Sequence, residues 1–159
     1  MINDLFITAV NNDISEGLSS ILSNLKSNNI GIPANSSCTK QGFQTTNLMD
    51  NEEIKPYLNK IIDLLPNKDF KHRWFHMIDY DINGLQEEHN HIQTEIYSYI
   101  IYLESSNTGH TYFSLSNQSK MFIQPVKNMI IFFPSWLMHG ALKVLDNKKV
   151  AVGALIKKD

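Results

Sequence analysis

The chain has 159 residues, of which 42% are hydrophobic, enough for one well-packed domain over residues 1–159 but few for two. Its formal net charge of −2 gives no electrostatic reason to expect a nucleic-acid partner. No apolar run is long enough to span a membrane, the N-terminus lacks the pattern of a signal peptide, and a lone cysteine, Cys38, excludes an internal disulfide. Together these features predict a soluble, cytoplasmic protein.

The first half of the sequence predicts one strand and two helices. Residues 4–10 have the composition of a strand. Apolar residues recur at helical spacing over 13–27 and again over 54–65, with polar residues on the opposite face. Residues 31–50 are polar and lack a period, so we expect irregular structure there.

After residue 70 the apolar period changes from that of helices to that of strands. Asp81-Ile82-Asn83-Gly84 is a turn signal that ends the first of these strands. The predicted strands are residues 72–80, 95–103, 110–115, 120–124, 128–133, 141–145 and 150–156. Two helices followed by many short strands predict a mainly β, α+β fold, with a pair of sheets and the helices packed outside.

Three histidines are the most informative residues. His89 and His91 stand at i and i+2, so their side chains leave an extended chain on the same side and can reach one metal ion. His139 follows an aromatic strand and a Pro-Ser-Trp turn that fixes its backbone. Three imidazoles would bind a borderline metal such as Fe(II) and leave coordination positions open. The other interpretation of an H-x-H pair is a surface coincidence.

The chain from Trp74 onward resembles the 2-oxoglutarate/Fe(II) oxygenases related to prolyl hydroxylases. A short segment, Gly42-Phe43-Gln44-Thr45, is also similar to that family. The matching motifs are Trp74-x-His76, His89-x-His91 and Phe133-Pro134-Ser135-Trp136-Leu137-x-His139. The resemblance implies a double-stranded β-helix (jelly roll, cupin-like), with Fe(II) bound by His89, His91 and His139. It also implies 2-oxoglutarate as cosubstrate, which is converted to succinate while a substrate is hydroxylated.

The sequence departs from the family pattern at two positions. Where His91 stands, the superfamily usually has Asp or Glu, so the metal here would lack an anionic ligand. The cation for the distal carboxylate of 2-oxoglutarate is usually Arg, whereas Lys149 stands at that place. Lys148 and Lys149 would point to opposite faces of a strand, and we expect Lys149 to face inward; a solvated Lys-Lys turn is the alternative.

Three further residues are candidates for the cosubstrate site. Tyr97 and Tyr99 share one face of a strand, and a phenol can donate to a carboxylate. His76 lies on the strand expected to cross the site. Packing in the core is the alternative for each of them. We also expect Trp136 to pack beneath the site and fix His139.

The predicted function is that of a dioxygenase acting on a protein side chain of the prolyl type or on a small molecule, without a nucleic-acid or membrane partner. A cupin-type dioxygenase, isomerase or lyase that does not use 2-oxoglutarate is the second hypothesis, with Glu95 as fourth ligand. A non-catalytic binding module is the third. The oligomeric state is left open between a monomer and a homodimer.

Overall fold

The computed structural model describes residues 5–33, 38–92 and 94–159. Two helices, α1 (Asn12–Ser27) and α2 (Lys55–Asp63), precede most of the strands. The strands are β1 (Ile7–Val10), β2 (Ile32–Pro33), β3 (Thr39–Gln44), β4 (Phe70–His89), β5 (Tyr97–Tyr102), β6 (Thr111–Ser114), β7 (Lys120–Ile123), β8 (Met129–Pro134), β9 (His139–Ala141) and β10 (Lys148–Lys157). A 3₁₀ turn at Ser116–Gln118 links β6 to β7. No helix in these ranges is long and apolar enough to cross a membrane.

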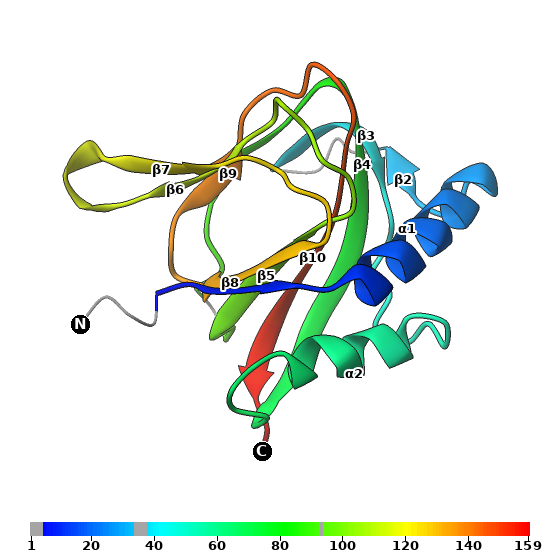
Figure 1. The fold of residues 1–159 in the computed structure, drawn as a ribbon, viewed down its shortest axis with the longest axis vertical. Coiled ribbons are helices and arrows are strands. Elements are labelled where there is room, and N and C mark those ends of the chain that lie inside the picture. The colour runs from blue at the N-terminus through cyan, green and yellow to red at the C-terminus, as the bar shows by residue number, and fades with distance from the viewer. Residues whose placement is uncertain (1–4, 34–37, 93) are drawn as a thin grey trace.

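Within the described residues, ten strands form one curled antiparallel sheet. Its order is β1-β8-β5-β10-β4-β9-β6-β7, with β3 also paired to β4 and β2 paired to β3. Figure 1 shows the sheet rolling over on itself, with both helices on one side and the β6–β7 hairpin far from them. The prediction of a mainly β, jelly-roll type fold with two helices packed outside is confirmed.

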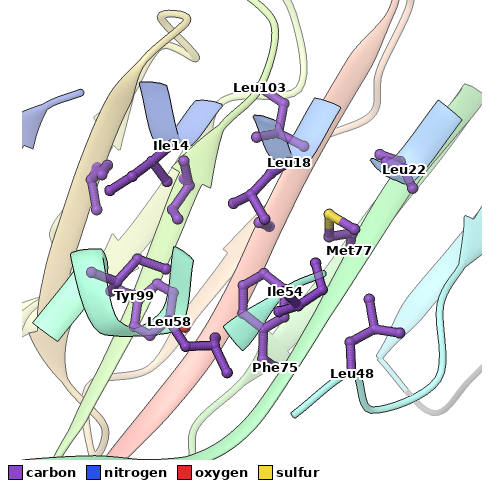
Figure 2. Packing of buried hydrophobic residues seen from close by; sticks show 14 of the residues in the cluster. Ile14, Leu18, Leu22, Leu48, Ile54, Leu58, Phe75, Met77, Tyr99 and Leu103 are labelled. Atoms are coloured by element: carbon purple, nitrogen blue, oxygen red, sulfur yellow. The ribbon is translucent and has the colours of Figure 1, made fainter. Parts of the chain in front are cut away.

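The helices cover the outer face of the sheet. Helix α1 begins after Asn11, whose side-chain oxygen accepts a hydrogen bond from the backbone N–H of Ile14 at 2.9 Å. Its apolar stripe, Ile14, Leu18 and Leu22, is fully buried against the outward side chains of β4 and β5 (Figure 2). Burial of that stripe, rather than the intrinsic stability of the helix, holds α1 in place.

A second apolar cluster fills the interior of the roll. It includes Ile78 and Tyr80 from β4, Tyr102 from β5 and Phe133 from β8. Because side chains alternate along a strand, β4 contributes Phe75 to the helix side and Ile78 to the interior. Each long strand therefore contributes side chains to both clusters. The alternation of its side chains decides which residues can reach a site inside the roll.

Two sequence expectations about local structure are wrong. The turn predicted at residues 81–84 is a bend inside the continuous strand β4, with Asn83 in the left-handed region at φ 69°. The region predicted to be irregular contains β3, which pairs with both halves of β4 through a bulge. Gly42 lies in that bulge at φ 139°, where a Cβ would be 2.4 Å from the Asp79 carbonyl oxygen. Sheet pairing, which a local pattern does not report, overrides the turn signal.

We predict that Leu18→Ala lowers the free energy of unfolding by about 2–5 kcal/mol, because it leaves a cavity between α1 and the sheet. Leu145, which is 62% exposed, provides the matched control, and Leu145→Ala should change the same quantity by less than about 0.5 kcal/mol. Urea unfolding followed by circular dichroism measures both. Equal losses in the two variants would contradict the assigned helix–sheet core.

Candidate metal centre

The register of the sheet brings the three histidines together. His89 is the last residue of β4 and pairs directly with His139, the first residue of β9. His91 follows two residues later, and its backbone N–H donates to the carbonyl oxygen of Ser135 at 2.8 Å. Ser135 is buried, and its hydroxyl bonds that of Ser98 on β5 at 2.9 Å. One serine thus ties the turn before His139 to both the His91 segment and the sheet.

One ring nitrogen from each of His89, His91 and His139 can be chosen so that all three lie within 4.8 Å of one another. The ring centroids are 4.4 Å apart for His89 and His139, and 4.9 Å for His89 and His91. No other group of three or more acidic, histidine or cysteine side chains in the described ranges is as close. The three histidines therefore lie close together in the fold, as the sequence predicts.

Backbone carbonyls fix the protonation of two of these rings. His89 Nδ1 lies 2.8 Å from the Glu87 carbonyl oxygen, and His139 Nδ1 lies 2.9 Å from the Leu137 carbonyl oxygen. A carbonyl oxygen only accepts, so Nδ1 donates in both rings and the Nε2 lone pair is left for a cation. No hydrogen bond to the ring of His91 is present among the described residues.

Burial also keeps the three rings neutral. It lowers the pKa of His139 to about 3 and that of His91 to about 4, and each is lowered further by a neighbouring imidazole. The pKa of His89 is lowered as well, mainly by burial. Neutral imidazoles are the form that binds metals. The chemistry of the donor set therefore fits a borderline divalent cation such as Fe(II).

A buried lysine lies in the same interior. Lys148 and His139 line one narrow cavity inside the roll. The Lys148 side chain is 2% exposed, its Nζ donates to the Gly109 carbonyl oxygen at 2.6 Å, and it lies 5.3 Å from the centre of the Tyr80 ring. No carboxylate in the described residues contacts it, and burial lowers its pKa to about 7. An ammonium buried without a counter-ion is costly, and an anionic ligand would offset that cost.

Lys149 faces the other way, contrary to the sequence expectation. Its Nζ donates to Glu104 Oε1 at 2.9 Å, and the two charged groups are partly exposed. The reason is the register of β10, in which Lys148 pairs with Tyr80, an interior residue of β4. Neighbouring residues of a strand alternate between faces, so Lys149 is directed away from the cavity.

Tyr97 and Tyr99 also lie on the outer face of the sheet. The Tyr99 hydroxyl bonds His72 Nδ1 at 3.1 Å in the helix-side core, and the Tyr97 ring contacts that of Phe70. The phenols that do face the interior are Tyr102, which donates to Thr111, and Tyr80.

Sequence reasoning missed Tyr80 as a residue of the cavity. Its hydroxyl donates to Gln86 Oε1 at 2.7 Å, and both residues line the cavity. Tyr80 stands four residues after His76 on β4, an even separation that places both on one face of the strand. That spacing was the available signal.

The remaining candidates lie around the histidines. His76 stacks on Trp74 at 5.2 Å between ring centroids, and burial, with a smaller effect of the neighbouring His91 and His89, lowers its pKa to about 4. Glu95 is not part of the ligand group; its carboxylate accepts hydrogen bonds from the Trp74 indole and the Thr94 backbone. Trp136 is 60% exposed, so the expectation that it packs beneath the site is wrong.

Comparisons with known proteins give the fold and not the reaction. No protein-family profile and no curated sequence matches the chain. A prolyl-4-hydroxylase of Pseudomonas putida superposes with a TM-score of 0.77 at 14% identity, covering 99% of this chain and 96% of the other. A prolyl hydroxylase of Trichoplax adhaerens, solved with a hypoxia inducible factor peptide, gives 0.77 at 13% identity over 98% and 86%.

A non-haem α-ketoglutarate-dependent epimerase, SnoN from nogalamycin biosynthesis, gives a TM-score of 0.79 at 7% identity, covering 97% of this chain and 78% of the other. The fold is therefore that of the 2-oxoglutarate/Fe(II) oxygenases. At such low identity, and with two kinds of reaction among the similar structures, the fold alone does not assign an activity.

The state of Lys148 leads to a prediction about stability. Its pKa is 10.5 when unfolded and about 7 when folded, so between these values only the unfolded chain holds the proton and stability rises with pH. Lys148→Met should therefore raise the free energy of unfolding by about 1–4 kcal/mol near pH 6.5, and by much less near pH 9.5. Urea titrations at the two pH values measure this, with Lys149→Met as control. A gain that does not change with pH would show that Lys148 carries no charge penalty.

Proposed function

We propose that this chain is an Fe(II)/2-oxoglutarate-dependent dioxygenase, an oxidoreductase whose metal is held by His89, His91 and His139. One observation carries the proposal: three neutral imidazoles converge, and one of them, His139, lines a narrow cavity together with Lys148, a buried ammonium without a counter-ion. A metal-binding group alone would fit many proteins. The buried ammonium narrows the choice of function, because it favours an anionic ligand in the cavity that His139 also lines.

Lys148 is proposed as the residue that binds the distal carboxylate of 2-oxoglutarate, in place of Lys149. The ammonium is fixed by the Gly109 carbonyl oxygen and has donors to spare. The apolar side chains of Ile100, Val150 and Val152 line the same cavity, so a charged hydrogen bond formed there is little weakened by water.

When bound, iron and 2-oxoglutarate supply the oxidising chemistry, in which O₂ and the oxoacid give CO₂ and succinate while a C–H bond of the substrate is hydroxylated. The protein holds and orients these reactants. Glu87 and Leu137 carbonyl oxygens keep the Nε2 atoms of His89 and His139 free to bind the cation. The apolar interior excludes water from the reacting groups.

The proposed substrate is a protein side chain, of the prolyl type, or a small molecule. The peptide complex of the Trichoplax adhaerens enzyme supports the first, and the epimerase of nogalamycin biosynthesis supports the second. Ile92 and Trp136, both exposed, flank the segments that carry His91 and His139 and offer apolar area to either. We assign His76, on the interior face beside His91, to contact with the substrate or cosubstrate.

Removal of one imidazole should abolish metal binding. For His139→Ala and, as a milder change, His89→Gln, we expect no saturable Fe(II) binding in anaerobic calorimetry, because two ligands do not hold the ion at micromolar concentrations. His110→Ala, outside the ligand group, should bind like the wild type. Stoichiometric binding in both ligand variants would contradict the assigned centre.

The adjacent lysines provide a matched test of the cosubstrate site. Lys148→Met should weaken 2-oxoglutarate binding to the iron-loaded protein at least about tenfold, the equivalent of one charged hydrogen bond. Lys149→Met should change it less than about twofold. Calorimetry gives the Kd, and succinate release under O₂ reports turnover. Iron binding without 2-oxoglutarate binding in the wild type would instead favour the cupin-type enzyme.

A further inference from the structure

The three histidines are not held in the same way. His89 and His139 each bond a backbone carbonyl two residues earlier in the chain. The ring of His91 has no hydrogen bond among the described residues and is held by ring contacts. One of these is with Trp74, whose ring centroid is 5.1 Å away at an angle of 61°. His91 also stands where the superfamily usually has a carboxylate, so the one unusual ligand is the one without a hydrogen-bonded partner.

The same indole holds a carboxylate. Trp74 Nε1 donates to Glu95 Oε1 at 3.3 Å, and the Thr94 backbone N–H donates to Glu95 Oε2 at 3.0 Å. Stacking on His76 at an angle of 20° fixes the plane of the indole. Trp74 therefore touches His91 and binds Glu95, and the two donors stabilise the ionised form of Glu95.

Glu95 differs from the other acidic residues in its relation to a metal-ligating histidine. Its carboxylate is bonded by the same indole that contacts the His91 ring, and its charge raises the pKa of that imidazole, against the lowering by burial. The nearby Glu87 side chain is exposed and paired with Lys40 instead. A divalent cation bound by three neutral ligands would receive no negative charge from the ligands themselves. A nearby fixed anion therefore has a larger effect on its binding than in a centre with a carboxylate ligand.

We propose that Glu95, held by Trp74, is the anion of this metal centre outside the ligand set, and that it acts through His91. This inference rests on the proposed metal centre and adds a positioning residue to it. The carboxylate compensates part of the charge of the cation and acts on the His91 ring through space, with no hydrogen bond between them. The hydrogen bond from Trp74 holds the carboxylate, which stands outside the ligand group.

The first experiment measures Co(II) binding by calorimetry, together with the visible spectrum of the Co(II) protein. Glu95→Gln removes the charge but keeps an oxygen that accepts from Trp74. We expect affinity to fall about tenfold, with the stoichiometry retained and the d–d bands shifted. Glu88→Gln, at a carboxylate that is paired with Lys120, is the matched control and should change affinity less than about twofold. Circular dichroism verifies that each variant is folded.

The second experiment asks whether the charge is the cause. In a His91→Asp background the carboxylate ligand supplies negative charge directly, so Glu95→Gln should there cost less than about twofold. Trp74→Phe keeps a ring against residue 91 but removes the donor to Glu95. It should weaken Co(II) binding in the wild type and add little when combined with Glu95→Gln, because it acts through Glu95.

The outcomes separate the inference from the function on which it rests. A wild-type protein that binds no Co(II) overturns both. A wild-type protein that binds it with the same affinity and spectrum as Glu95→Gln overturns the role of Glu95 alone. Complete loss of Co(II) binding in Glu95→Gln would make Glu95 a direct ligand and also overturn the inference. An equal cost of Glu95→Gln in the wild type and in His91→Asp would exclude charge compensation.

Discussion

The pairing of β4 with β9 is the constraint on which the site depends. His89 and His139 are 50 positions apart in the numbering, and their rings meet because the two residues are partners in one antiparallel ladder. A shift of one residue in that ladder would turn one ring away, since side chains alternate between faces. The bond between the Ser98 and Ser135 hydroxyls and the bonds from the Ser135 backbone hold the adjoining turn. Sheet geometry, rather than any property of the histidines, thus creates the centre.

The same alternation organises the rest of the molecule. One face of each long strand packs under the helices, and the other lines the roll. Lys148 and Lys149 show how strongly this decides chemistry, because one peptide unit separates a buried, unpaired ammonium from a partly exposed lysine in an ion pair. The buried one is unfavourable for the folded protein. Stability given up at such a position is commonly recovered when the ligand binds.

The three histidines and the two helices were predictable from the sequence, because the patterns that indicate them are local. The H-x-H spacing and the turn before His139 identified the three histidines without knowledge of the strand register. Both helices followed from the period of their apolar residues. Lys149, Tyr97 and Tyr99 were assigned to the cavity in error, because the face that a strand residue occupies is set by partners far along the chain. The bend at Asn83 read as a turn for the same reason: β3 and β9 pair with the second half of β4 and keep it extended.

The two tryptophans stand near the histidines in the chain or in the fold, but their surroundings differ. Trp74 touches a ligand ring and is partly buried, whereas Trp136 lies open to water three residues before His139. Intrinsic emission should therefore contain a bluer component and a redder one. A paramagnetic ion bound by the histidines would quench the bluer component, and a molecule covering Trp136 would shift the redder one. The unmodified protein thus carries its own optical readout of both events, with no label attached.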